Sequence, residues 1–294
     1  MSKKIQILII SDGKAGHESQ SLGLAEAMAR LVKAEIHVLK MNFERRFLGR
    51  IRELSAKSEE FSKPDYVIAA GSATNLPLLQ ISKKYGARSI CLMKPGLPLA
   101  FYDFCIAPEH DFPVPPKGGN VILSKGALNR VVAGGGERAG KLLLIGGPSG
   151  VHGYDEKKLI WEIFRIVDGD GWEVADSRRT PETFLPSLLG EIKGLKAFPH
   201  ADTEDGWLAR KLSTVEEVWV TEDSVSMIYE ALSGGAKVGV LEMPRLKPGS
   251  RVLRGLKTLE AEGYLIGSGD GRPPLLAEAD RCAELVLDSA GKEG

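Results

Sequence analysis

The sequence predicts an α/β protein built from two doubly wound, Rossmann-like domains that face each other across a cleft. Short apolar runs alternate with helical patterns along the whole chain, which is typical of parallel sheets covered by helices on both faces. The apolar run Ile5–Ile10 near the start is echoed at Leu142–Ile145, and each run leads into a glycine-bearing loop. Between the two series lies a glycine-rich stretch, Ala133–Gly140, which reads as a linker. We therefore expect one domain over residues 1–135 and another over residues 136–294.

Composition narrows the class of protein. At 294 residues the chain is long enough for two ordinary cores. Its 39 basic and 39 acidic residues cancel, so no overall field favours nucleic acid as a partner. Its 3 cysteines are widely spaced, which indicates a reducing, cytoplasmic setting. The opening MSKKIQILIISDG reads as a first strand and not as a signal peptide, and no apolar run approaches the roughly 18 residues that a spanning helix needs.

The first domain is expected to begin with strand Ile5–Ile10, followed by the loop Ser11–His17. Ligands of open α/β sheets bind beyond the carboxyl ends of the strands, so this loop and the turn after the third strand are candidate walls of a site. The loop spacing matches neither G-x-G-x-x-G nor G-K-[ST], which disfavours nicotinamide and P-loop nucleotides. The remaining expected strands are Ile36–Leu39, Tyr66–Ala70, Arg88–Leu92 and Phe104–Ala107, and the candidate loop residues are Gly13, Lys14, Gly16, Gly71 and Ser72.

A basic amphipathic helix is expected between the second and third strands, over Phe43–Lys57. Its apolar residues fall on one helical face and its arginines decorate the rest. A helix of this kind can lie on an anionic membrane surface, which would place the protein at the inner face of a membrane. The more ordinary interpretation is a helix packed on its own sheet with a solvated basic side.

The second domain repeats the strand and helix alternation. Its first strand, Leu142–Ile145, enters the loop Gly146–Gly150, and the last helix is expected over Leu275–Leu287. The other expected strands are Trp172–Ala175, Leu195–Phe198, Val218–Val220, Val238–Leu241 and Tyr264–Ile266. The other expected helices are Glu156–Ile166, Phe184–Leu189, Gly206–Leu212 and Val252–Ala261, together with a helix that starts at Ser224 and ends at Gly234.

The stretch Val218–Leu241, VWVTEDSVSMIYEALSGGAKVGVL, is the most informative part of the chain. Polar residues crowd the start of its helix, where unpaired N–H groups and the helix dipole favour a phosphate. Glu230 follows nearly two turns later, where its carboxylate can accept both vicinal hydroxyls of a ribose. The ordinary alternative is a capped helix in which Asp223 or Ser224 is the N-cap and Glu230 is solvated.

Three loops of the second domain, each after a separate strand, together hold the groups that a nucleoside diphosphate needs. They supply glycines for close backbone approach, two guanidinium groups for the pyrophosphate, hydroxyls, a helix N-terminus and a carboxylate. Alone, the arginines would more often be solvent-exposed, so the convergence of the loops carries the prediction. The predicted donor-binding residues are Gly146, Gly147, Ser149, Ser177, Arg178, Arg179, Thr180, Thr221, Glu222, Asp223, Ser224, Ser226, Met227 and Glu230.

Neither a metal nor a cofactor is expected. The Asp168-Gly169-Asp170 triplet could be read as a metal-binding D-x-D, but it lies between a helix and the next strand, on the side away from the expected cleft, where Asp-Gly turns are common. The 5 histidines are scattered without ligand spacing. Charge on a leaving phosphate would then be met by the arginines and the helix dipole.

A base that could deprotonate an acceptor hydroxyl is available in the first domain. The sequence has no G-x-S-x-G elbow, which disfavours a serine hydrolase. Histidine is the residue type that most readily exchanges a proton at neutral pH, so His17, or Asp12 beside it, could take a proton from an acceptor. A surface histidine that caps a helix is an equally ordinary interpretation of His17.

The motifs SDGKAGHESQSLGLAEAM, APEHD, LSKGALNRV, LIGGPSG, SRRTPET and VTEDSVSMIYEALSGGAKV resemble, in this order, those of the bacterial and plant mitochondrial-fission protein family. That family is regarded as glycosyltransferases of the two-domain B-type architecture, with members linked to lipopolysaccharide core synthesis. The resemblance implies a metal-independent fold with the nucleotide-sugar donor in the second domain and the acceptor in the first. Carried over by position, the acceptor-side loop would include Asp12, Gly13, Gly16 and His17.

We therefore expect a glycosyltransferase that moves a sugar from a nucleoside-diphosphate sugar to the hydroxyl of a glycan or a lipid-linked acceptor. Two alternatives stay open. One is a nucleotide-sugar epimerase or hydrolase on the same architecture, which would convert a donor without an acceptor. The other is a non-catalytic adaptor that binds a membrane or a protein through the Phe43–Lys57 helix or the cleft.

Overall fold

The structure, a computed structural model, describes residues 4–42, 47–267 and 275–291. The chain divides into two compact units. Unit 1 combines Met1–Arg130 with the C-terminal Ala277–Gly294, and unit 2 is Val131–Leu276. The predicted boundary after residue 135 lies close to the first division. The C-terminal segment, however, belongs to unit 1 and not, as predicted, to the second domain.

Unit 1 contains a parallel sheet whose described strands follow the order β2-β1-β3-β4-β5-β6. The chain therefore moves to one side of β1 to form β2 and to the other side to form β3, which places the topological switch point between β1 and β3. The strands are β1 (Ile5–Ser11), β2 (Ala34–Lys40), β3 (Tyr66–Ala70), β4 (Arg88–Leu92), β5 (Phe104–Pro108) and β6 (Val121–Ser124).

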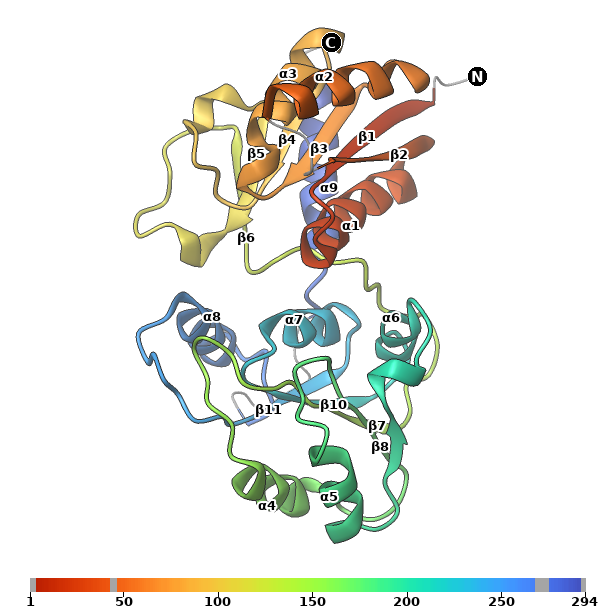
Figure 1. The fold of residues 1–294 in the computed structure, drawn as a ribbon, viewed down its shortest axis with the longest axis vertical. Coiled ribbons are helices and arrows are strands. Elements are labelled where there is room, and N and C mark those ends of the chain that lie inside the picture. Colours follow the sequence, from red (N-terminus) through yellow and green to blue (C-terminus); the bar gives the residue numbers. More distant parts are fainter. Residues whose placement is uncertain (1–3, 43–46, 268–274, 292–294) are drawn as a thin grey trace. The chain divides into compact units, whose positions relative to one another are not determined.

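Helices cover both faces of this sheet (Figure 1). Leucine and methionine side chains of α1 (Ala15–Leu31) pack with one face, where α9 (Glu278–Gly291) joins them. The opposite face is covered by α2 (Phe47–Lys57) and α3 (Asn75–Tyr85). Short 3-10 turns lie at Ser58–Glu60, Ser72–Thr74, Leu99–Phe101 and Glu109–Asp111.

Unit 2 contains a second parallel sheet, with described strands in the order β11-β10-β7-β8-β9. Helices α6, α7 and α8 pack on one face and α4 and α5 on the other (Figure 1). The strands are β7 (Lys141–Leu144), β8 (Trp172–Ala175), β9 (Lys196–Phe198), β10 (Glu217–Thr221) and β11 (Lys237–Leu241). The helices are α4 (Glu156–Ile166), α5 (Phe184–Glu191), α6 (Trp207–Leu212), α7 (Val225–Ser233) and α8 (Arg251–Ala261), with a 3-10 turn at His200–Asp202.

Most predicted elements are present, with three differences. The sequence reading missed β6, a four-residue strand at the edge of its sheet whose side chains are only partly buried apart from Ser124. The strand predicted at Tyr264–Ile266 is reduced to a single bridge between Leu265 and Val238. The helix predicted from Phe43 is described from Phe47, and residues 43–46 lie outside the described part of the chain.

Helix α2 packs on its own sheet, because Leu54 is buried in the core beside Leu8 and Val67. This is the more ordinary of the two interpretations of the basic helix, and contact with a membrane stays a prediction. No helix among the described residues combines the length and the apolar character that crossing a membrane requires.

Helix α9 belongs to unit 1 because its apolar face completes the core of that unit. Cys282, Ala283 and Val286 are fully buried against α1 and the sheet. Arg281 adds one anchor, since its Nη2 donates to the carbonyl oxygen of Leu123 at 2.6 Å, and within the helix it also donates to Glu278 at 2.7 Å. A linear reading of the sequence could not foresee that the last helix packs with the first.

Truncating Val286 tests this packing. Val286→Ala should destabilise unit 1 by about 2 kcal/mol through lost apolar burial and the cavity left behind. Leu285→Ala, at a position that is 41% exposed on the same helix, should cost less than about 0.5 kcal/mol. All 4 tryptophans lie in unit 2, so their fluorescence follows the unfolding of unit 2 by urea, while circular dichroism follows both units. Only the circular dichroism transition should shift in Val286→Ala, and an equal shift in Leu285→Ala would contradict the assignment of α9.

Candidate functional site

The candidate site of unit 2 lies at the point where the strand order reverses. From β7 the chain passes to β8 and β9 on one side and returns to β10 and β11 on the other. All neighbouring strands are parallel, so the loops after β7, β8 and β10 leave the sheet at the same edge. Ligands of open α/β sheets bind in the crevice beyond such a switch point.

The three loops contact one another directly, as the sequence predicted. The Gly146 N–H donates to the hydroxyl of Thr221 at 2.6 Å, and the Gly147 N–H donates to Asp223 Oδ2 at 3.1 Å. These bonds join the loop after β7 to the loop after β10. Gly147 must be glycine, because a Cβ atom there would lie 2.0 Å from the backbone oxygen of Arg179.

Arg179 joins all three loops. Its Nη1 lies 2.7 Å from Asp223 Oδ2 and donates to the carbonyl oxygen of Gly147 at 3.1 Å. Its Nη2 donates to the hydroxyl of Ser224 at 3.1 Å. The Asp223 side chain is fully buried, and its second oxygen, Oδ1, has no hydrogen-bond partner within the described chain. The guanidinium therefore compensates a buried carboxylate, while the neighbouring Arg178 is exposed and forms no hydrogen bond or ion pair with a described residue.

Thr180 and Ser177 shape the loop after β8 and do not face outward. The buried Thr180 hydroxyl shares its proton between the carbonyl oxygens of Ile145 (2.8 Å) and Gly146 (2.7 Å), and it accepts the Ser177 N–H at 2.9 Å. Together with Thr221, these residues support the site from behind. The sequence had placed them among the residues that contact a donor.

The N-terminus of α7 is open. Its first turn starts after Ser224, whose side chain does not cap the helix. Helices α4 and α8, by contrast, are capped by Asp155 and Ser250. Among the described residues, the N–H groups of Val225, Ser226 and Met227 find no acceptor, so three donors and the positive end of the helix dipole face the converging loops.

Glu230 lies one turn after Ser226 on the same, partly exposed side of α7. Its carboxylate makes no hydrogen bond or ion pair with any described residue. Burial raises the pKa of Glu230 from 4.5 to about 7. A carboxylate that is partly desolvated and has no partner is unusual in a folded protein, and such groups cluster at functional sites.

The structure gives Glu222 a different task from the predicted one. Glu222 is buried and forms an ion pair with Arg245. Arg245 Nη2 donates to Glu222 Oε1 at 2.6 Å. Arg245 Nε donates to both carboxylate oxygens, to Oε1 at 2.9 Å and to Oε2 at 3.1 Å. His152 is buried beside it, with Nε2 3.6 Å from Glu222 Oε2. Glu222 thus anchors the loop and does not face a donor.

Sequence reasoning missed His152 and Arg245. The two residues form a backbone bridge, and the Leu246 N–H donates to the carbonyl oxygen of Val151 at 2.8 Å. This short ribbon ties the loop after β7 to the chain that follows β11. No local pattern announces it, because the partners lie far apart in the sequence.

Unit 1 has its own cluster at its switch point. The Asp12 carboxylate is buried and lies 2.9 Å from Nδ1 of His17, whose side chain is 19% exposed. An ionised carboxylate can only accept, so Nδ1 carries the proton and Nε2 is left able to accept one. Gly71, in the turn after β3, has a φ of 91°, and a Cβ atom there would lie 2.4 Å from the His17 ring.

Other predicted site residues are placed as follows. Ser149 closes the loop after β7, since its hydroxyl accepts the N–H groups of Val151 (3.2 Å) and His152 (3.0 Å). Lys14 lies 3.6 Å from Asp12. Of the remaining glycine and serine positions at the switch point of unit 1, Gly13 lies in the loop after β1, Gly16 in the first turn of α1, and Ser72 in the 3-10 turn after β3.

The Asp168 carboxylate lies away from the candidate site of unit 2. It pairs with Lys141 at 2.5 Å and accepts from Trp172 Nε1 at 3.1 Å, and these partners begin β7 and β8. It is therefore at the amino ends of the strands, as the sequence indicated. Within the described ranges, no group of three or more His, Cys, Asp or Glu side chains is arranged to hold a metal ion.

The glycines of the loop after β7 allow a direct test of the convergence. Gly147→Ala should destabilise unit 2 by about 1–3 kcal/mol, because the new Cβ collides with the backbone of Arg179. Gly150→Ala in the same loop meets nothing within 4 Å and is the matched control. Urea unfolding followed by tryptophan fluorescence measures both. Equal stability of the two variants would show that the loops do not pack as described.

The family model of mitochondrial fission ELM1 matches residues 15–290, so the chain belongs to this family. No curated protein matches the sequence. Solved structures match over nearly the whole chain at low identity, and they establish a GT-B fold alone. A UDP-GlcNAc 2-epimerase from Neisseria meningitidis bound to UDP-GlcNAc has a TM-score of 0.56 and 14% identity, with 97% of this chain and 100% of that chain covered. MnaA of S. aureus with UDP has a TM-score of 0.52 and 12% identity, with 98% of this chain and 97% of that chain covered. A UDP-glucosyltransferase from Polygonum tinctorium has a TM-score of 0.51 and 11% identity, with 97% of this chain and 95% of that chain covered.

Proposed function

We propose that this member of the mitochondrial fission ELM1 family is a metal-independent glycosyltransferase that uses a nucleoside-diphosphate sugar. The observation that carries the proposal is the uncapped N-terminus of α7, at which the loops after β7, β8 and β10 meet. An open helix start with three available N–H donors binds an anion without further devices. The acceptor is proposed to be a hydroxyl of a glycan or of a lipid-linked sugar.

The diphosphate is proposed to bind at this helix start. Donation from the N–H groups of Val225, Ser226 and Met227 would satisfy groups that otherwise lack a partner. Arg178 would add the uncompensated positive charge, since Arg179 already neutralises Asp223. These groups would also meet the charge that develops on the diphosphate as it leaves the sugar.

The ribose is proposed to bind Glu230. Glu230 lies four positions after Ser226, so its backbone is about 6 Å further along the helix axis than the proposed phosphate-binding N–H groups. That spacing suits a nucleoside whose phosphate is at the helix start. A carboxylate that accepts two hydroxyls forms charge-assisted hydrogen bonds, which also accounts for a partly buried acid without a protein partner.

The base is proposed to be His17, oriented by Asp12. The bond from Nδ1 to the buried carboxylate fixes the tautomer and stabilises the imidazolium that forms when Nε2 takes a proton. During transfer the acceptor hydroxyl would lose its proton to Nε2 while its oxygen attacks the anomeric carbon. The bond from that carbon to the diphosphate oxygen would break, and the electron pair would leave with the diphosphate.

The comparisons support a nucleotide-sugar substrate in general and leave its identity to experiment. Two of the similar structures contain UDP or UDP-GlcNAc, and a third is a UDP-glucosyltransferase. Calorimetric titration with UDP, GDP and ADP tests the binding site, and release of nucleoside diphosphate from a panel of nucleotide sugars tests turnover. Failure to bind any of them would remove the proposal. Conversion of a donor without an acceptor would identify an epimerase or hydrolase instead.

The pH dependence of nucleotide binding tests the role of Glu230. Because its pKa is raised to about 7 and ribose needs the carboxylate, the affinity for UDP should fall up to about tenfold for each pH unit below 7. Glu230→Gln should bind at least about tenfold more weakly above pH 7 and lose this pH dependence. Titration calorimetry at several pH values measures both effects. A pH profile shared by the two proteins would rule out ribose binding by Glu230.

Glu230→Gln should weaken UDP binding but stabilise unit 2 above neutral pH. A loss of binding that is accompanied by higher stability cannot come from misfolding. Burial favours protonated Glu230, so the stability linked to it is complete below about pH 4.5 and is lost as the pH rises through about 7. Glu230→Gln, neutral at every pH, should therefore raise the urea midpoint of unit 2 at about pH 8 and leave it unchanged at about pH 4.

Substitutions in unit 1 test the base. His17→Ala should lower kcat by about 10²–10⁴ and leave UDP binding unchanged. Asp12→Asn should also lower kcat and alter its pH profile, because the imidazole loses the carboxylate that fixes its tautomer. His37→Asn, on β2 beside Gln6, is the control and should retain activity. Full activity of His17→Ala would exclude His17 as the base.

A further inference from the structure

We propose that unit 2 carries a second binding site, a groove for a neutral oligosaccharide, along the β11 edge of its sheet, with α8 on one face and α4 on the other. We call it the Trp219 groove. This inference goes beyond the proposed function and does not depend on it, because a glycan can bind there with no nucleotide present. Its evidence is the shape of the surface, the setting of its aromatic side chains and the character of its polar rim.

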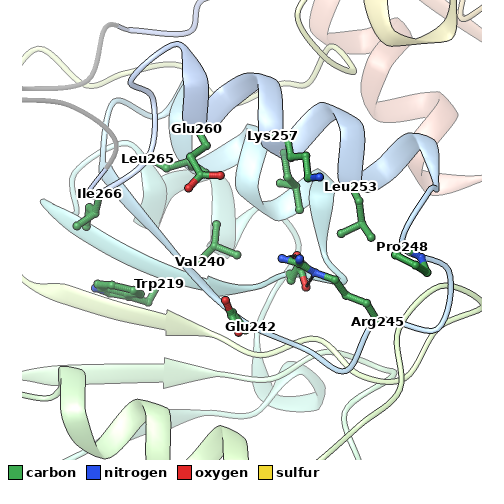
Figure 2. A pocket seen from close by; sticks show the side chains of 12 residues that line it. Trp219, Val240, Glu242, Arg245, Pro248, Leu253, Lys257, Glu260, Leu265 and Ile266 are labelled. Carbon is green, nitrogen blue, oxygen red and sulfur yellow. Dashed lines mark hydrogen bonds and ion pairs between the residues drawn. The ribbon is translucent and has the colours of Figure 1, made fainter.

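The groove consists of two hollows that share Trp219, Val240 and Glu242. The first has a volume of about 280 Å³ and lies between the strands and α8. Figure 2 shows Lys257 and Glu260 of α8 reaching toward Val240, Glu242 and Arg245. The second hollow, of about 550 Å³, lies beside α4. Because they have three lining residues in common, the hollows can hold adjacent units of one chain-like ligand.

Trp219 provides a flat apolar surface where the two hollows meet. A Cβ atom at Gly239 would lie 2.4 Å from the indole ring, so the ring lies directly against the backbone of β11. The indole Nε1 donates to Glu217 at 2.8 Å, which fixes the orientation of the ring. The ring remains partly exposed and lines both hollows. An aromatic face is negatively polarised, and it attracts the positively polarised C–H groups on one side of a sugar ring.

A second tryptophan extends this surface. Trp161 of α4 lines the second hollow and is 57% exposed, although large aromatic side chains are normally buried. The guanidinium of Arg165 lies 4.7 Å from the Trp161 ring centre, which restrains the ring. Two restrained tryptophans on one groove are suited to successive sugar rings.

The rim of the groove supplies hydrogen-bond donors and acceptors in equal measure. Arg245 uses Nε and Nη2 for Glu222, so that within the described chain its Nη1 keeps free donor capacity. Lys257 and Glu260 form no ion pair with a described residue. Sugar hydroxyls both donate and accept, so they match such a mixed rim. The charged groups of the two hollows are the cations Lys158, Arg165, Arg245 and Lys257 and the carboxylates Glu162, Glu222, Glu242 and Glu260.

The balance of charge favours this occupant over the alternatives. Anionic lipid or nucleic acid would need an excess of cations, which the rim does not have. A neutral, hydroxyl-rich chain satisfies the groups of both signs without leaving a charge buried and unpaired.

Binding of defined trisaccharides tests the proposal. Maltotriose, cellotriose, mannotriose and N,N′,N″-triacetylchitotriose are titrated at millimolar concentrations into the full chain without nucleotide, with tryptophan fluorescence and saturation-transfer NMR as readouts. At least one should bind. Trp161→Ala should weaken that binding about three- to tenfold, the loss of one aromatic contact. Glu260→Gln, at an exposed position on the rim, should also weaken it.

Phe164→Ala is the matched control. Phe164 is 65% exposed on the same helix as Trp161, yet it does not line either hollow, so its loss should leave binding unchanged. Equal losses in Trp161→Ala and Phe164→Ala would overturn the proposal, as would the absence of binding by all four trisaccharides. Binding of the chain to anionic vesicles that Trp161→Ala abolishes would assign the groove to a membrane surface and would likewise overturn it. A failure of nucleotide binding, measured separately with UDP, has no bearing on this result.

Discussion

The candidate site of unit 2 depends on the direction of its strands. Since β7, β8, β10 and β11 are parallel, the loops that follow them leave the sheet at one edge, and the reversal of order between β7 and β10 separates the helices on either side. Without that reversal the glycines after β7 and the start of α7 would not meet. Every contact that shapes the site, from the Gly146 N–H to the Arg179 guanidinium, builds on this arrangement.

Two adjacent buried carboxylates hold the loops in place. Glu222 and Asp223 follow β10 directly, and each is paired with a half-exposed arginine from another loop, Arg245 and Arg179 respectively. A buried charge is tolerated only with a well-placed partner, and removing that partner typically costs about 3–5 kcal/mol. The two ion pairs therefore pin the chain after β10 from both sides. They leave the start of α7 between them, with N–H groups that the protein itself does not use.

Unit 1 uses the same geometric rule for different chemistry. Its switch point brings together the loop after β1 and the turn after β3, and Gly71 leaves room for the His17 ring. A buried carboxylate again organises the cluster, but here Asp12 orients an imidazole and not a guanidinium. One fold class thus provides an uncapped helix start in unit 2 and an imidazole beside a buried carboxylate in unit 1. The proposed transfer assigns the diphosphate to the first and the proton acceptor to the second.

Local patterns in the sequence were sufficient to predict the fold class, nearly all strands and the convergence of three loops. Apolar runs such as Tyr66–Ala70 and helical periodicity such as Glu156–Ile166 are set by neighbouring residues, and the alternation of the two dictates parallel sheets. The carboxyl ends of those strands then meet at one edge by geometry alone. The likeness of the motifs to one family was also visible in the sequence.

Only the tertiary structure decided which polar residues at that edge face outward and which face inward. Glu222, Thr180 and Thr221 have the same residue types as ligand-binding groups, yet they bond to Arg245 and to backbone atoms from distant loops. The placement of α9 in unit 1 likewise rests on contacts with α1, at the opposite end of the chain. Sequence patterns report on residues a few positions apart. The partner of a buried charge and the packing position of a terminal helix depend on residues that are far apart in the sequence and come into contact only when the chain folds.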